Sequence, residues 1–365
     1  MSEPEGGASQ STQGEPEGRS GPASVLDTQG IYAATAGLPE QVFDAAERAR
    51  GLGDLPSLDR IEHVVVLGMG GSGVAGDILA ATAGPFMPVP VVVAKGYELP
   101  AFVGDTSLVF AVSFSGNTEE TVEVASTAAV EGARMVCVTQ GGELGRLAHS
   151  WGVPVIPVPA DIPQPRVGLG ALAIPPLVVL EEIGLFPGAS QWVDNAIEQL
   201  RERRDELVND DNPALRLARR IGRTIPVIYG GGQLGATAAS RWKNQINENA
   251  KSPAFWNAYP ELCHNEVAGW GQHGDLTRQA MTVVNLRHEF EHPQVSRRVD
   301  LVSDMVDEVV ASVLTIEAEG EGQLAQLLDL ILIGDFVAWH LAAEAGVDPG
   351  PVDALDAVKK ALASP

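Results

Sequence analysis

The chain has 365 residues, 45% of them hydrophobic, and a formal net charge of −24 at pH 7. This length allows two domains with sizeable cores, and the acidic charge excludes broad nucleic-acid binding. No apolar run reaches the roughly 18 residues of a membrane span, the N-terminus has no signal-peptide pattern, and the two cysteines, Cys137 and Cys263, are too few for a disulfide framework. We therefore expect a cytoplasmic protein without a membrane or nucleic-acid partner.

The first segment in chain order, residues 1–24, is rich in Gly, Ser, Glu, Gln and Pro and contains almost nothing apolar. Such a composition cannot bury a core, so it predicts a disordered acidic tail. Order is expected from residue 25 onward, in three parts. These are a first α/β domain at 25–186, linking helices with a second α/β domain at 187–345, and a last part at 346–365 that ends in a helix.

Strands and helices alternate within both predicted domains. The expected helices include 38–52, 119–131 and 352–362. The expected strands lie at 63–67, 89–94, 108–112, 135–138 and 154–158 in the first domain, and near 225–229, 280–285 and 312–316 in the second. This alternation is typical of doubly wound parallel sheets. The predicted fold class is therefore α/β, with two such domains in tandem.

Two glycine turns follow corresponding strands of the two halves. Residues 63–73 read HVVVLGMGGSG and residues 225–235 read IPVIYGGGQLG. At such a strand-to-helix turn, backbone N–H groups and the positive end of the helix dipole bind phosphate. The duplicate implies two similar halves. Both turns also match G-x-G-x-x-G, so a nicotinamide-dependent enzyme is an alternative, with Glu98 in the place of the ribose-binding acid.

A turn rich in hydroxyl groups follows the strand at 108–112. It reads SFSGNT, and a helix with two glutamates in its first turn comes next. A dinucleotide site uses bare glycine backbone, whereas hydroxyls suit a terminal phosphate monoester, whose oxygens accept several short hydrogen bonds. The alternative is a cluster of N-cap residues without a ligand. Three hydroxyls here, close to Ser72 in the first glycine turn, exceed what a cap needs.

Five separated motifs in order resemble those of a known family, the sugar isomerase (SIS) domain proteins. They are GMGGSG, SFSGNTEET, IPQPRVGLGAL, NQINENAKSPAFWNAYPELCHNEVAGW and DALDAVKKAL, and the resemblance runs from about residue 27 to the C-terminus. Among tandem SIS proteins, the chain is similar to the bifunctional phosphoglucose/phosphomannose isomerases of archaea and actinobacteria. The resemblance implies a substrate phosphate site at Gly71, Ser72, Ser113, Ser115 and Thr118.

The activity that this resemblance implies is aldose–ketose isomerisation. Fructose 6-phosphate would be interconverted with glucose 6-phosphate, mannose 6-phosphate or both, through a cis-enediol(ate). The reaction needs a phosphate anchor, a group that opens the ring, a carboxylate base and a cation near the enediolate oxygens. It needs no cofactor, and no metal ion if the protein supplies the cation.

The resemblance assigns the base to Glu248 and the cation to Arg166. An arginine is always protonated, so it stabilises the enediolate charge without giving up its proton. His264 matches the ring-opening histidine, whose pKa suits proton relay. In the family this histidine enters the neighbouring subunit's site, which implies a homodimer. Lys359 matches a C-terminal lysine that assists ring opening, with Lys360 as the alternative.

Three further points stay open in the sequence. Val352 stands where some relatives are expected to have a threonine, which leaves the preference between the two epimers undecided. Residues 288–292 read HEFEH and match the zinc-protease pattern H-E-x-x-H, but they follow a strand and precede Pro293, so we expect a charged loop at the end of that strand. A non-catalytic SIS regulator that binds a sugar phosphate is the alternative function; no helix-turn-helix segment or basic face supports it.

Overall fold

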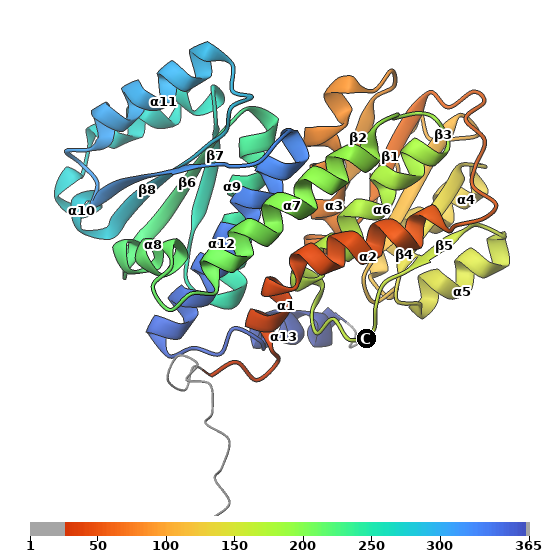
Figure 1. Ribbon diagram of the computed structural model, residues 1–365, viewed down its shortest axis with the longest axis horizontal. Helices are drawn as coiled ribbons and strands as arrows, with labels where there is room; N and C mark the ends of the chain where they lie inside the picture. The colour runs from red at the N-terminus through yellow and green to blue at the C-terminus, as the bar shows by residue number, and fades with distance from the viewer. Residues whose placement is uncertain (1–25, 363–365) are drawn as a thin grey trace, which may run out of the picture.

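The computed structural model describes residues 26–362, so the acidic tail predicted at 1–24 lies outside the described residues. Two parallel sheets lie side by side, with helices between them and on their outer faces (Figure 1). The predicted fold class, two doubly wound α/β domains in tandem, is confirmed. One hydrophobic cluster runs from Val66 in the first sheet to Ile228 and Val284 in the second, so the two halves share a core. The domain limits at residues 25, 186 and 345 stay a prediction.

The first sheet has five parallel strands in the order β2-β1-β3-β4-β5. Their bounds are β1 (His63–Leu67), β2 (Val91–Ala94), β3 (Ser107–Ser113), β4 (Arg134–Thr139) and β5 (Val155–Pro157). Strand β3 is buried along its whole length, as expected for a parallel sheet covered on both faces. The strand order reverses between β1 and β3. Ligands of such sheets bind at this switch point, outside the carboxyl ends of the strands.

Helices cover both faces of the first sheet. Alternate residues of β1 are buried on opposite faces of this sheet. Val64 and Val66 belong to one cluster, whereas Val65 and Leu67 belong to the other. The helices are α1 (Ile31–Ala36), α2 (Leu38–Arg50), α3 (Gly70–Thr82), η1 (Gly84–Phe86), α4 (Glu119–Val130), α5 (Gly142–Trp151) and α6 (Leu169–Glu182), and the single turn η2 (Pro165–Val167) precedes α6.

The second sheet has four parallel strands in the order β7-β6-β8-β9. They are β6 (Ile225–Gly231), β7 (Phe255–Tyr259), β8 (Met281–Arg287) and β9 (Ser312–Glu317). The sequence pattern does not predict β7. This strand is short, lies between Pro253 and Pro260, and forms the edge of the sheet with Phe255 and Trp256 exposed, so it lacks both the apolar run and the alternation of a buried strand.

The helices of the second half include one central helix, α12, against which α7, α8 and α9 pack. They are α7 (Ala189–Leu207), α8 (Pro213–Ile221), α9 (Gly232–Asn249), η3 (Glu261–His264), η4 (Glu266–Gly271), α10 (Gly274–Ala280), α11 (Pro293–Val306), α12 (Gln323–Ala345) and α13 (Asp353–Leu362). By length and composition, α12 alone among the described helices could cross a membrane, a feature that sequence analysis did not register. Its apolar stretch is buried inside the protein, where it packs against α7, α8 and α9.

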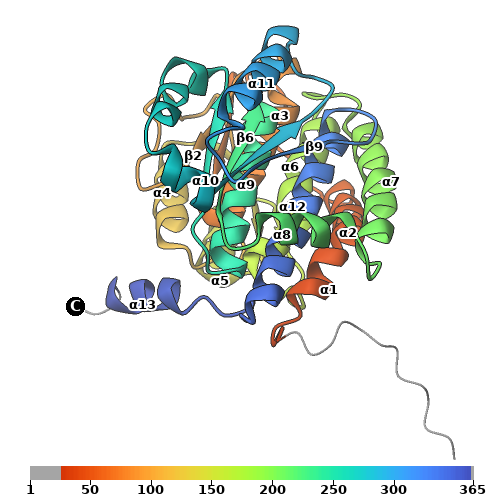
Figure 2. The same cartoon turned by 90° about the vertical axis from the view of Figure 1, so that its left-hand side faces the viewer.

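Helix α13 differs from the other long helices because it stands away from the body of the protein (Figure 2). All of its described side chains are exposed, including Leu355, Val358 and Leu362. These three residues lie on one side of the helix, because residues three, four and seven positions apart share a face. A helix with an uncovered apolar face of this kind lacks the tertiary packing that normally stabilises it.

Candidate active site

The first glycine turn brings the start of α3 to the switch point. Strand β1 ends at Leu67, α3 begins at Gly70, and no side chain caps the helix, so its first N–H groups are available to an anion. Gly71 approaches the η2 segment closely: a Cβ atom there would lie 3.1 Å from the carbonyl carbon and oxygen of Pro165. Only glycine permits this approach without displacement of the backbone.

The hydroxyl-rich turn lies beside this glycine turn. The buried Oγ of Ser72 accepts a hydrogen bond from the backbone N–H of Phe114 at 3.1 Å, which ties the two turns together. Ser113 Oγ lies 3.0 Å from Thr118 Oγ1 and accepts from the N–H of Gly116. Thr118 is the N-cap residue of α4, yet its side chain makes no capping bond. Ser115 Oγ accepts from the N–H of Asn117 at 3.2 Å. The five predicted phosphate-binding residues are thus gathered at one edge of the sheet, and Thr118 is not used as a helix cap.

Arg166 is buried next to this edge, with 3% of its surface exposed. Its Nε donates to Asn249 Oδ1 at 2.8 Å, and its Nη2 donates to the carbonyl oxygens of Pro349 and Gly350 at 2.7 and 2.6 Å. Burial lowers the pKa of Arg166, and the nearby Glu248 carboxylate opposes that shift. Arginine stays protonated in proteins, so the group is a fixed cation.

Glu248 lies near the end of α9, with its Oε2 3.9 Å from Arg166 Nη1. Its side chain is 29% exposed, so a ligand can reach it. In the part of the chain that the structure describes, no hydrogen bond engages the carboxylate, which leaves both oxygens able to accept a proton. The predicted base and the predicted cation are therefore neighbours, beside the two phosphate turns.

Other buried polar side chains surround this pair and were missed by sequence analysis. Arg241, Gln245 and Asn249 recur every four residues on α9, so they share one helix face. Arg241 donates to the carbonyl oxygen of Arg166 and pairs with the buried Asp335 of α12 at 2.8 Å. This polar row on an otherwise apolar helix face was a signal that could have indicated them.

The other two predicted catalytic residues, His264 and Lys359, lie elsewhere. His264 is exposed at the end of η3, just after β7. Lys359 is exposed on α13. Within residues 26–362, no hydrogen bond or ion pair joins either side chain to Arg166 or Glu248. A single chain thus brings together the phosphate residues, Arg166 and Glu248, and it does not bring His264 and Lys359 to them.

The HEFEH segment forms a turn between β8 and α11, as expected for a loop at the end of a strand. His288 is buried with its Nε2 2.9 Å from the carbonyl oxygen of Gly231, and His292 is the N-cap of α11, where its Nδ1 accepts from the N–H of Gln294. The two histidines therefore do not share a helix. Among the described residues, no group of three or more His, Cys, Asp and Glu side chains could hold a metal ion.

This segment also covers the second glycine turn. The side chain of Glu291 is 3% exposed and pairs with Arg287 at 3.0 Å. A Cβ atom at Gly231 would lie 3.1 Å from Oε1 of Glu291. The chain thus places a carboxylate of its own beside the start of α9. This negative charge disfavours a phosphate at the second turn.

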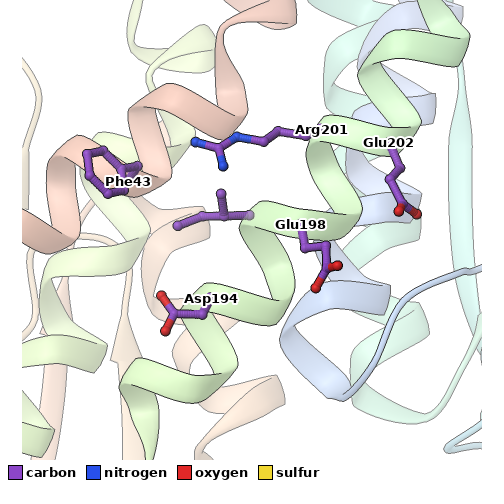
Figure 3. Close-up of a pocket in the computed structure, with 6 residues that line it drawn as sticks. Phe43, Asp194, Glu198, Arg201 and Glu202 are labelled. Carbon is purple, nitrogen blue, oxygen red and sulfur yellow. The ribbon is translucent and has the colours of Figure 1, made fainter.

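A shallow hollow lies apart from these residues, between α2 and α7. Its lining includes Phe43, Ile197 and Arg201 together with three acidic side chains of α7, Asp194, Glu198 and Glu202 (Figure 3). Arg201 extends towards Phe43, and the three carboxylates are spaced four residues apart along the helix. Three carboxylates would repel a phosphate dianion, so this hollow is not a suitable substrate site.

Comparisons with known proteins identify the family of the chain. Residues 57–151 match the model of the SIS domain, and residues 210–362 match that of the bacterial phospho-glucose isomerase C-terminal SIS domain. A bifunctional phosphoglucose/phosphomannose isomerase of Caldicellulosiruptor bescii is 34% identical over 337 residues, which cover 91% of this chain and 99% of that protein. One of Aquifex aeolicus is 34% identical over 300 residues, covering 82% of this chain and 90% of that protein.

A solved structure shows the same fold at lower sequence similarity. It is the C-terminal domain of glucosamine-fructose-6-phosphate aminotransferase from Francisella tularensis, with a TM-score of 0.64 and 18% identity. The match covers 88% of this chain and 97% of that one. At this identity the likeness concerns the fold alone.

Proposed function

Since the chain belongs to the family of bifunctional phosphoglucose/phosphomannose isomerases, we propose that it interconverts fructose 6-phosphate with glucose 6-phosphate and mannose 6-phosphate. The observation that carries this proposal is the 3.9 Å approach of Arg166 to Glu248, beside two turns suited to phosphate. The reaction requires this combination of an anchor, a base and a cation.

In the proposed mechanism, the substrate phosphate binds at the start of α3 and at the hydroxyls of residues 113–118. Glu248 takes the proton from one of the two reacting carbons and returns it to the other. The enediolate that forms between these steps is stabilised by the Nη1 group of Arg166, so no metal ion is needed. Carbon 2 is planar in the enediolate and can be reprotonated from either face, so one base can serve both epimers if the pocket tolerates rotation about the adjacent bond.

We also propose that the active enzyme is a homodimer in which His264 enters the site of the partner subunit. Two features support this arrangement. His264 follows the edge strand β7, whose Phe255 and Trp256 are exposed. Exposed aromatic side chains at a sheet edge are typical of surfaces that a partner covers. A second copy would both cover this edge and deliver an imidazole that can open the sugar ring.

Lys359 is proposed to assist ring opening once α13 is covered by the rest of the assembly. It lies four residues after Leu355 and three before Leu362, so it borders the uncovered apolar face of the helix. Lys360 lies four residues after Asp356, on the polar side. Docking of the apolar face would therefore carry Lys359, rather than Lys360, towards the covered surface. Val352 lies directly before the helix, and the preference between the two epimers stays undecided at this position.

The proposed cellular location is the cytoplasm, in line with the free thiols of Cys137 and Cys263. The activity is tested by incubating pure protein with fructose 6-phosphate in EDTA and assaying both aldose phosphates. Formation of both products is expected. Tight binding of fructose 6-phosphate without conversion would instead indicate a non-catalytic SIS regulator, and activity lost only in EDTA would contradict the metal-free mechanism.

A further inference from the structure

The segment Asp348–Gly350, called the strap below, lies against the guanidinium group of Arg166. A guanidinium has five N–H donors. The bonds to Asn249 Oδ1 and to the carbonyl oxygens of Pro349 and Gly350 use the Nε donor and both donors of Nη2. Only Nη1 is left, and this is the nitrogen that lies 3.9 Å from Glu248.

We propose that Asn249 and the strap are positioning residues, which hold Arg166 so that Nη1 faces Glu248 and the reacting carbons. This inference rests on the function proposed above. A misplacement of about 1 Å can cost on the order of 100-fold in rate, so a group that fixes the cation has a measurable effect on turnover. The strap contributes two backbone carbonyls to this task, which is why no sequence motif reveals it.

The backbone of Arg166 is fixed as well as its side chain. Arg241 donates to the Arg166 carbonyl oxygen and is itself held by Asp335. Two residues before Arg166, the Gln164 side chain donates to Oε1 of Gln29 at 2.7 Å. The backbone and the side chain of Arg166 are thus both constrained. Rotation of the guanidinium would break three hydrogen bonds of a side chain that is 3% exposed.

The strap is in turn held by contacts that serve no other evident purpose. Thr28 Oγ1 donates to Asp348 Oδ2 at 2.6 Å, and the N–H of Gly350 donates to Asp348 Oδ1 at 2.9 Å. Lys251 Nζ donates to the carbonyl oxygens of Glu248 at 2.6 Å and of Pro349 at 3.1 Å. Lys251 therefore links the end of α9, which carries the base, to the segment that holds the cation.

Gly350 and Asn249 offer separate ways to disturb this arrangement. A Cβ atom at Gly350 would lie 2.8 Å from Cγ of Gln29, so a methyl group there would push the strap away from its support. Asn249 is fully buried, and its Nδ2 has no hydrogen-bond partner among the described residues. A buried donor without a partner costs about 1–3 kcal/mol. Among the described residues, the bond that offsets this cost is the one that Asn249 Oδ1 accepts from Arg166 Nε.

The kinetic test compares Asn249→Leu and Gly350→Ala with the wild type. In both variants kcat should fall about 10- to 100-fold, while KM for fructose 6-phosphate changes little, because the phosphate residues are untouched. Asn249→Gln keeps a neutral amide acceptor for Arg166 Nε and should retain more of the turnover than Asn249→Leu. Gly53→Ala is the matched control, since a Cβ atom there meets nothing within 4 Å.

Chemical rescue separates positioning from a general structural effect. Arg166→Ala should regain turnover when guanidinium ion is added at concentrations that do not unfold the protein, because Asn249 and the strap carbonyls would bind it. In Arg166→Ala/Asn249→Leu this rescue should be lost or need much more guanidinium. Should Gly350→Ala not fold, the Asn249 variants decide alone.

The outcomes are distinguishable. A wild type without isomerase activity overturns the proposed function and this inference with it. An active wild type whose turnover survives both Asn249→Leu and Gly350→Ala overturns the positioning role alone. If guanidinium restores turnover equally in Arg166→Ala and in Arg166→Ala/Asn249→Leu, the positioning role is also overturned.

Discussion

Nη1 of Arg166 lies 3.9 Å from Oε2 of Glu248, although Arg166 precedes α6 beside the first sheet and Glu248 lies near the end of α9 beside the second. The helices α3 and α9 are in contact where the two halves meet. The cation and the base therefore come from different halves of a duplicated fold, and their separation depends on the packing between those halves.

The phosphate anchor is tested by replacing Ser113 and Ser115 together with alanine. Each lost hydrogen bond to a charged phosphate removes about 1.5–3 kcal/mol, so KM for fructose 6-phosphate should rise at least tenfold. Turnover can fall as well, because remote binding supports the chemical step. Ser126→Ala, which removes only a bond to the carbonyl of Val122 on α4, is the control. Unchanged affinity in the double variant would place the phosphate elsewhere.

The base is tested by Glu248→Gln, which keeps the size of the side chain and removes the proton acceptor. Turnover should fall on the order of 10²–10⁴-fold while the substrate still binds. In deuterated water, the wild type should introduce deuterium at carbon 1 of fructose 6-phosphate and the variant should not. Glu261→Gln serves as the comparison: exchange that is lost there and kept in Glu248→Gln would transfer the role to Glu261.

The contribution of His264 across a dimer is tested by mixing subunits. His264→Ala and Glu248→Gln should each be nearly inactive on the ring-closed substrate. In an isologous dimer that combines the two variants, one site has both wild-type side chains, so random mixing should restore about a quarter of the wild-type sites. Co-expression with two tags allows the mixed dimer to be isolated. A mixed dimer without activity would show that His264 does not act in the partner's site.

A pH effect on stability is expected from His340, which is buried on α12 next to Asn212. Burial lowers its pKa to about 4, and its Nε2, 3.3 Å from the Asn212 amide nitrogen, accepts rather than donates. The unfolded chain binds this proton with a pKa of about 6.5. The contribution of His340 to the free energy of unfolding is therefore fully present above pH 6.5. It is lost as the pH drops from 6.5 towards 4, by up to about 3 kcal/mol.

This effect is measured as the unfolding temperature of the wild type and of His340→Gln between pH 7 and pH 4.5. The glutamine keeps an acceptor and does not titrate, so the variant should lose less stability in acid than the wild type. His149→Gln, at an exposed position on α5, should follow the wild-type curve. Parallel curves for the wild type and His340→Gln would rule out His340 as the source of acid sensitivity.

The sequence was sufficient to predict the class of the fold and most of its strands, because buried parallel strands are continuous apolar runs. It did not predict β7, whose outer side chains are exposed at an edge. The proximity of Arg166 to Glu248 was implied by the family resemblance and not by spacing. The strap and the pair formed by Arg241 and Asp335 could not be predicted, because both depend on which distant segments pack together.

The carboxylate beside the second glycine turn makes the two halves unequal. Both halves contain a strand, a glycine turn and a helix, yet the Glu291 carboxylate lies beside Gly231, the N-cap residue of α9. This negative charge disfavours a phosphate at the start of α9, and the far end of that same helix carries Glu248. A sugar with one phosphate group is therefore expected to bind in one orientation, with its phosphate at the first half and its reacting carbons at Glu248.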